Sequence, residues 1–144
     1  MVRRLILITG LLGVLPVAFA AAPRDTDVLQ GKWVMQALVI GGSPSTEAMI
    51  GTGKLEVQGE KYTVHFGDKV VPSTFKLDAT KSPKEISLTN AEGLFGKTYS
   101  GIYKLTDDTF TMCRESEPNG RRPKEFVSRP GSGNILVVWR RVGK

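Results

Sequence analysis

The side chains that could carry out acid–base or nucleophilic chemistry are few and scattered. The chain contains one histidine, His65, and one cysteine, Cys113. A metal site usually needs several His, Cys or carboxylate ligands that converge, and a Ser-His-Asp triad would have to use His65. Asp68 follows closely, but the sequence has no G-x-S-x-G turn to present a nucleophilic serine. We therefore predict no metal site, and we expect His65 to be a solvated surface side chain.

Three further arrangements suggest chemistry but have simpler explanations. The amides of residues 130–134 (Pro-Gly-Ser-Gly-Asn) could hold an anion, yet the segment lacks the spacing and lysine of a P-loop. Asp107 and Asp108 could form the carboxylate pair of a glycosidase, yet Asp is favoured in turns for backbone reasons alone. Cys113 lies in an apolar strand pattern, which favours a buried, inert thiol. We predict no catalytic residues, no cofactor and no enzymatic activity.

The first twenty residues have the three parts of a secretory signal peptide. Arg3 and Arg4 form a positive start, an apolar run extends over Leu5–Phe19, and residues 18–20 (Ala-Phe-Ala) form a cleavage site. The run is about 15 residues, shorter than the roughly 18–20 that a membrane-spanning helix needs, and no cysteine is present at the cut to accept a lipid. We predict a mature chain that begins at Ala21, has no transmembrane segment, and is exported to the periplasm or outside the cell.

Residues 21–144 form a chain long enough for one domain with one core. Cys113 alone can form no internal disulfide, so stability must come from packing. Loss of Arg3 and Arg4 with the signal lowers the net charge from +6 to +4, and the excess lies late in the chain, in Arg121, Arg122, Lys124, Arg129, Arg140, Arg141 and Lys144. No aromatic residues interleave these charges as in a base-stacking surface. We therefore predict a solvated basic loop over residues 115–133 and no nucleic-acid partner; the sequence leaves the oligomeric state open.

Alternation of apolar and polar residues predicts eight strands, at Lys32–Ile40, Lys54–Gln58, Lys61–Phe66, Val70–Leu77, Glu85–Thr89, Thr98–Leu105, Thr109–Arg114 and Asn134–Arg141. The turns Gly59-Glu60 and Gly67-Asp68 are typical of hairpins. One or two short helices are expected. Asp25–Gly31 forms a short turn or helical lead-in, and Pro44–Ile50 forms a short helix capped by Ser43 or Ser45.

Short links between consecutive strands predict an all-β antiparallel meander. About eight such strands remove their free edges by closing into an up-and-down β-barrel. A two-sheet sandwich is the alternative. Because Pro72 cannot donate to a ladder, its strand is expected at an edge or at a bulge.

The residues Gly31-Lys32-Trp33, at the start of the first strand, resemble the G-x-W signature of lipocalins. In that fold the tryptophan closes one end of the barrel, and an arginine from the last strand lies over it. The resemblance therefore implies that Trp33 closes the barrel, with Arg140 or Arg141 over its ring.

A wider resemblance covers nearly the whole mature chain. Six segments occur in order: Leu29–Trp33 (LQGKW), Phe75–Asp78 (FKLD), Lys81–Ile86 (KSPKEI), Gly101–Leu105 (GIYKL), Arg122–Phe126 (RPKEF) and Pro130–Gly133 (PGSG). Together they resemble the lipocalin-like planctomycetal conserved domain, a family of unknown function. This resemblance implies a lipocalin-like fold and export, and it brings no catalytic residues.

The interior of an eight-stranded barrel either packs shut or holds one small ligand. The residues predicted to point inward are Met35, Ala37, Tyr62, Phe66, Phe75, Tyr99, Tyr103, Phe110 and Met112. They are mainly apolar, as a small-molecule pocket requires, and bulky enough to fill a small barrel. The first interpretation is an exported, non-enzymatic protein that binds a small apolar ligand among these residues; the alternatives are an envelope protein with a filled barrel and a loop-based enzyme or inhibitor. His65 and Cys113 have the opposite parity and are expected to point away from the cavity.

Overall fold

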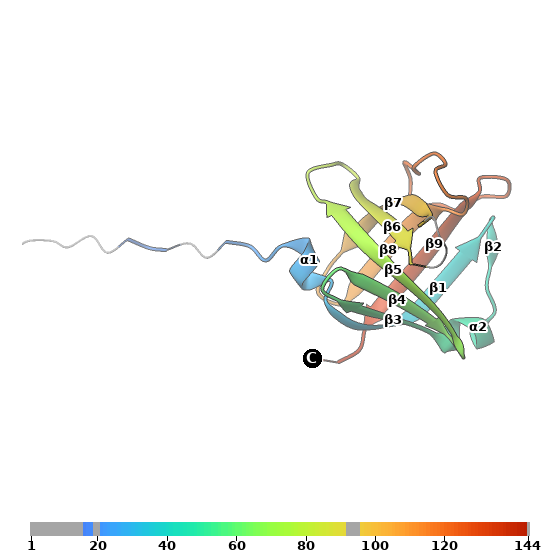
Figure 1. The fold of residues 1–144 in the computed structure, drawn as a ribbon, viewed down its shortest axis with the longest axis horizontal. Helices are drawn as coiled ribbons and strands as arrows, with labels where there is room; N and C mark the ends of the chain where they lie inside the picture. Colours follow the sequence, from blue (N-terminus) through green and yellow to red (C-terminus); the bar gives the residue numbers. More distant parts are fainter. Residues whose placement is uncertain (1–15, 19–20, 92–95, 144) are drawn as a thin grey trace, which may run out of the picture.

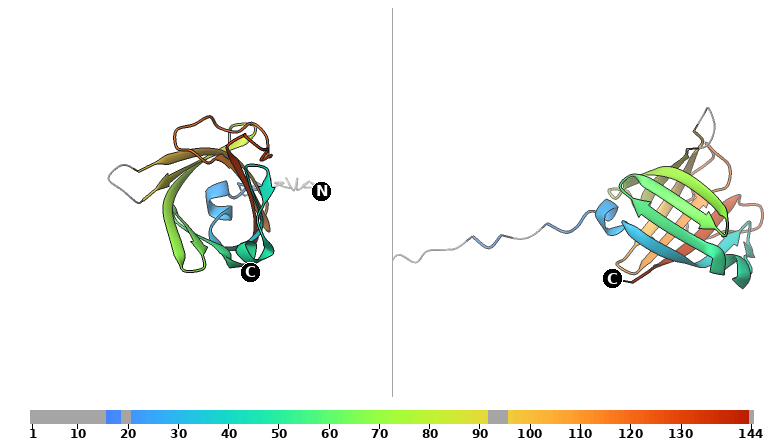
Figure 2. Two further views of the ribbon diagram at one scale, coloured as in Figure 1. Left: turned by 90° about the vertical axis from the view of Figure 1, so that its right-hand side faces the viewer. Right: turned by 60° about the horizontal axis from the view of Figure 1, so that its bottom comes forward.

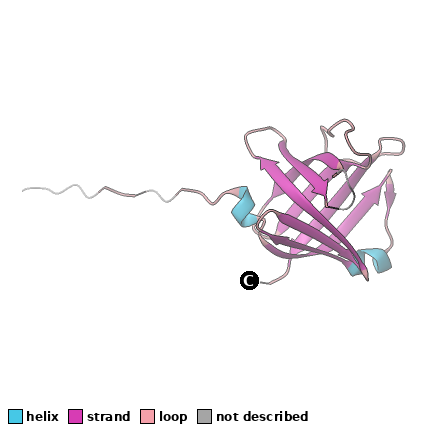
Figure 3. Ribbon diagram, in the orientation of Figure 1, coloured by secondary structure: helices cyan, strands magenta, loops and turns pink. Residues whose placement is uncertain are grey.

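The computed structural model describes residues 16–18, 21–91 and 96–143, so most of the predicted signal peptide, residues 1–15 and 19–20, lies outside the described residues. Within the described part, strands dominate and two short helices accompany them (Figure 1, Figure 3). In chain order the elements are α1 (Asp25–Val28), β1 (Gly31–Ile40), β2 (Ser43–Pro44), α2 (Glu47–Thr52), β3 (Gly53–Gln58), β4 (Lys61–Phe66), β5 (Lys69–Asp78), β6 (Lys84–Asn90), β7 (Thr98–Leu105), β8 (Thr109–Glu115) and β9 (Asn134–Arg141).

The strands close into an antiparallel barrel of eight strands, and β2 is an extra strand. The sheet order is β2-β1-β3-β4-β5-β6-β7-β8-β9, and β1 also pairs with β9. This last pairing joins the first barrel strand to the last, from Trp33 with Arg141 to Ile40 with Ile135. Figure 2 shows the resulting ring when the molecule is viewed along the barrel. The predicted barrel is therefore confirmed, and the sandwich is excluded.

A bulge in β1 changes which of its side chains face the interior. The register against β9 shifts between Met35 and Ala37. A bulge inserts one residue into the alternation, so the inward parity moves by one position. Leu38 is buried and Ala37 is only half-buried. The prediction that Ala37 faces the cavity was wrong for this reason.

Pro72 lies in an interior strand, because β5 pairs with both β4 and β6, so the prediction of an edge strand or bulge was wrong. The ladder to β6 begins one residue later, at Ser73 with Asn90. The Pro72 carbonyl accepts a hydrogen bond of 3.1 Å from the Ala91 amide, so this carbonyl points toward the β6 side of the strand. The Pro72 nitrogen points to the same side, and β6 ends at Asn90, before Ala91. The missing N–H therefore removes no bond of the ladder.

The predicted helix after β1 begins later than expected. Ser43 and Pro44 form β2, which pairs with β1, and the cap of α2 is Thr46 in place of Ser43 or Ser45. The Thr46 hydroxyl accepts a hydrogen bond of 3.3 Å from the Met49 amide. No helix of the described residues is long and apolar enough to cross a membrane.

Candidate functional site

One end of the barrel is closed by α1 and the segment that leads into β1 (Figure 1, Figure 2). Trp33, which is 1% exposed, donates from its indole nitrogen to the Leu29 carbonyl at 3.0 Å. The Arg141 guanidinium lies over the Trp33 ring, with its carbon 4.1 Å from the ring centre. Of the two arginines considered for this position, the structure places Arg141 there, whereas Arg140 is exposed.

Arg141 also ties the closing segment to the turn between β7 and β8. Its guanidinium donates to the carbonyls of Val28, Gln30 (2.7 Å) and Asp107 (2.6 Å). Gly31 lies beside it at a φ of +115°, and a β-carbon there would be 3.3 Å from the Arg141 Nη1 atom. The glycine of the Gly-Lys-Trp motif is therefore required by both its backbone conformation and the arginine beside it.

A carboxylate holds α1 to the barrel wall. The Asp25 carboxylate accepts hydrogen bonds from the Tyr103 hydroxyl at 2.7 Å and from the Lys84 ammonium at 2.8 Å. Burial raises the pKa of this carboxyl, but the hydrogen bonds from Lys84 and Tyr103 and the Lys84 charge outweigh it, so the pKa lies below 3.8. Asp25 is therefore ionised at neutral pH and fixes the helix across the end of the barrel.

Aromatic rings fill the interior next to this closed end. The Phe110 ring lies 6.1 Å from Trp33, 6.5 Å from Tyr62 and 6.3 Å from Tyr103, between ring centres. Phe75 packs edge-on against Tyr62 at 6.2 Å. These tilted and edge-on contacts are the favoured geometry of aromatic pairs. This half of the barrel is consequently packed shut.

The other half of the interior contains a cavity of about 190 Å³. Side chains from seven barrel strands line it, and most of them are apolar. The lining residues are Met35, Leu38, Tyr62, Val64, Phe66, Val71, Ser73, Leu88, Asn90, Tyr99, Met112, Arg114, Ser116, Ile135, Val137 and Trp139.

The predicted cavity residues divide between these two halves. Met35, Tyr62, Phe66, Tyr99 and Met112 line the cavity. The cavity wall does not include Phe75, Tyr103 and Phe110, which belong to the aromatic packing near the closed end. The alternation of the sequence predicts which side chains point inward, but it does not predict how far along the barrel axis they lie. Ala37 faces outward after the bulge.

Among the described residues, two polar atoms of the cavity wall are buried without a hydrogen-bond partner. They are the Tyr62 hydroxyl and the indole nitrogen of Trp139. The two residues are 1% and 2% exposed. Leaving such a group unpaired costs about 1–3 kcal/mol, and native proteins seldom leave one unpaired without a reason.

Arg114 places a positive charge in the same wall. Its guanidinium carbon lies 4.8 Å from the centre of the Tyr99 ring, and one nitrogen donates to the Glu115 carbonyl at 2.7 Å. None of the ion pairs formed among the described residues involves Arg114. Burial raises the pKa of the Tyr62 hydroxyl far above its usual range, although the Arg114 charge and the Trp139 indole N–H beside the hydroxyl oppose this. Tyr62 is therefore neutral and able to donate a hydrogen bond.

The comparisons with known proteins gave no match. No family model, curated protein or solved structure matches this chain.

The two residues most capable of general chemistry lie away from the cavity. His65 is half-buried on the outer face of β4, paired across the strands with Lys54. Cys113 is fully buried, and its thiol donates to the Val127 carbonyl at a distance of 3.6 Å. Burial raises the pKa of this thiol, and the hydrogen bond only partly offsets it, so the reactive thiolate is disfavoured. No group of three or more potential metal ligands converges among the described residues.

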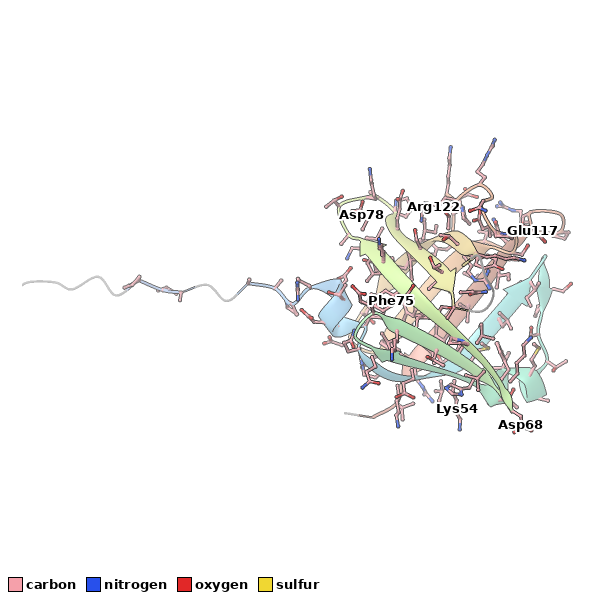
Figure 4. The ribbon with its side chains drawn as sticks, in the orientation of Figure 1. Lys54, Asp68, Phe75, Asp78, Glu117 and Arg122 are labelled. Atoms are coloured by element: carbon pink, nitrogen blue, oxygen red, sulfur yellow. The ribbon has the colours of Figure 1, made fainter. Side chains whose placement is uncertain are left out.

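The basic segment between β8 and β9 lies against the outside of the barrel, over β6 and β7. Arg122 donates to the carbonyls of Ile86 (2.7 Å) and Gly101 (2.6 Å) and pairs with Glu85 at 3.6 Å. Figure 4 shows Arg122 on the opposite side of the molecule from Lys54 and Asp68. The expectation of a solvated loop was therefore wrong for Arg122, which fastens the loop to the barrel, although Arg121 and Lys124 are exposed.

Proposed function

We propose that this protein is an exported, non-enzymatic, lipocalin-like binding protein that holds one small, mainly apolar ligand inside its barrel. The observation that carries the proposal is the cavity of about 190 Å³ in the half of the barrel away from α1. Its wall is mostly apolar with a few placed polar groups, which is the usual composition of a small-molecule pocket.

The closed end supports the same proposal. Trp33, Arg141 and Asp25 hold α1 rigidly across one end, so a ligand would enter from the other. The sequence motifs that resemble the lipocalin-like planctomycetal conserved domain support membership of that family and export. The predicted cleavage after Ala20 is tested by N-terminal sequencing of protein recovered from the cell envelope, and an intact Met1 would contradict export.

The test of binding is titration with toluene, a neutral probe of a size that the cavity accommodates. An engineered apolar cavity of about 150 Å³ binds benzene, so a cavity of 190 Å³ should bind one substituted ring. We expect saturable binding with 1:1 stoichiometry in calorimetry or ligand-observed NMR. Absence of saturable binding by the folded protein would contradict the proposal and favour a filled, structural barrel.

Two matched variants locate the bound probe. Val137 lines the cavity, whereas Val138, the next residue of β9, points outward. We expect Val137→Phe to abolish toluene binding and Val138→Phe to leave it unchanged. Val64→Phe, from the opposite wall, provides a second inward variant in case Val137→Phe destabilises the fold. His65→Ala and Cys113→Ser should not change binding.

A further inference from the structure

We propose that the ligand carries a carboxylate, which is bound by Arg114 together with the Tyr62 hydroxyl and the Trp139 indole N–H. This inference rests on the proposed binding function and specifies the chemical class of the ligand: a monocarboxylate with an apolar body of about one ring.

The polar groups of the cavity are predominantly donors. The Trp139 nitrogen and the Arg114 guanidinium can only donate, and the Tyr62 hydroxyl, kept neutral by burial, has a proton to donate. The one hydroxyl–amide pair in the wall is already satisfied, since Ser73 donates to the Asn90 side-chain oxygen at 3.0 Å. The Tyr99 and Ser116 hydroxyls of the wall can donate or accept, so every free polar group of the wall can donate to a ligand that brings acceptors.

The acceptor should be negatively charged, because Arg114 lines the pocket with a guanidinium. The Tyr99 ring stacked at 4.8 Å and the bond to the Glu115 carbonyl fix its orientation and leave other N–H groups for a ligand. A guanidinium binds a carboxylate through two parallel hydrogen bonds. One guanidinium balances one negative charge, so a carboxylate suits this mainly apolar site better than a dianionic phosphate.

The size of the cavity limits the rest of the molecule. Since about 150 Å³ accommodates benzene, about 190 Å³ accommodates a ring or a short chain with a small head group. The apolar wall of Met35, Leu88, Met112 and Val137 would contact this body. A long-chain lipid would extend out of the cavity through the open end of the barrel.

The experiment compares two probes of nearly equal shape, 3-phenylpropanoate and its neutral amide, by calorimetry at pH 7. We expect the wild-type protein to bind the carboxylate at least tenfold more tightly than the amide. In Arg114→Gln the two affinities should become equal, with the amide affinity changed by less than threefold. Arg140→Gln removes the same charge from the outside of β9 and should leave the ratio unchanged.

Tyr62→Phe gives a second test that keeps the charge. It should weaken binding of the carboxylate several-fold while toluene still binds. If the wild-type protein binds the amide as tightly as the carboxylate, or binds only toluene, the carboxylate inference is wrong and the binding function stands. If carboxylate preference persists in Arg114→Gln, the assignment of Arg114 is wrong. Failure of all three probes to bind overturns the binding function itself.

Discussion

In the two halves of the barrel interior, similar buried side chains differ in whether their polar atoms are hydrogen-bonded. Trp33 and Trp139 are both almost fully buried, but the Trp33 indole N–H is paired with the Leu29 carbonyl, whereas the Trp139 N–H has no partner. The same contrast holds for two tyrosines, since the Tyr103 hydroxyl bonds to Asp25 and the Tyr62 hydroxyl is unpaired. Among the described residues, Trp33 and Tyr103 at the closed end thus bond within the fold, whereas the corresponding groups of Trp139 and Tyr62 beside the cavity have no hydrogen-bond partner.

The arginines follow the same division. Arg141 donates to three backbone carbonyls and stacks on Trp33, so its charge serves the closure of the barrel. Arg114 makes one bond to a carbonyl and stacks on Tyr99 in the cavity wall. The difference separates a closed end, where polar groups bond within the fold, from the end that we propose as the binding end. Substitutions at the closed end should therefore reduce stability, and those around the cavity should alter binding.

The largest expected effect is that of Trp33→Ala. Truncating a buried tryptophan to alanine costs about 3–5 kcal/mol, because transfer free energy is lost and a cavity is left. The variant would also lose the stacking of Arg141 and the bond to Leu29. Urea denaturation measures the loss, and a variant that unfolds within a degree or two of wild type on heating would show that Trp33 does not close the barrel.

Arg141→Ala should have the next largest effect. Hydrogen bonds to charged groups contribute about 1.5–3 kcal/mol each, but these are partly solvated, so we expect a total loss of about 2–3 kcal/mol. Arg140→Ala is the matched control, since Arg140 is exposed and such surface changes usually remain within about 0.5 kcal/mol. Equal losses in the two variants, measured by urea denaturation, would contradict the role assigned to Arg141.

Much of this architecture was predictable from local patterns. All eight barrel strands were predicted within one or two residues of their observed bounds, because alternation and Gly-containing turns act over short distances. The position of Trp33 under an arginine of the last strand followed from a resemblance. The bulge after Met35 was not predictable from the sequence. No glycine or proline occurs there, and the bulge arises from how β1 pairs with β9, which is distant in the sequence.

The site itself was only partly predictable. Arg114 has the same parity as Phe110 and Met112, so its inward position could have been derived by extending the alternation to the end of the strand. The division of the inward residues between a packed half and a cavity could not, because it depends on how α1 folds back onto the barrel. The role of Asp25 depends on the same long-range contact.

A smaller effect distinguishes the two tyrosines directly. Tyr103→Phe removes a hydroxyl bonded to the Asp25 carboxylate and should destabilise the protein by about 1–2 kcal/mol. Tyr62→Phe removes a buried hydroxyl with no partner, so its free energy of unfolding should stay within about 0.5 kcal/mol of wild type or rise. Chemical denaturation of the ligand-free proteins measures both, and a Tyr62→Phe loss as large as that of Tyr103→Phe would remove the contrast between the two halves.

The smallest effect concerns pH and the attachment of α1. Burial raises the pKa of Asp25, but the bonds from Lys84 and Tyr103 lower it overall, so the folded value lies below the 3.8 of the unfolded chain. A carboxyl with a depressed pKa stabilises the folded state above its unfolded pKa, and this contribution is lost as the pH falls through the folded value. The stability difference between wild type and Asp25→Asn should therefore be constant from about pH 5 to 7 and shrink below about pH 4.

Two controls separate this effect from general acid denaturation. Asp27→Asn removes an exposed carboxylate of the same helix, whose ion pair with Arg24 should contribute little to stability. Tyr62→Phe should differ from wild type by an amount that does not change over this pH range, because no carboxylate bonds to its hydroxyl in the described structure. If the Asp25→Asn difference also remained constant down to pH 3, the carboxylate would not fix α1, and the closed end would depend on Trp33 and Arg141 alone.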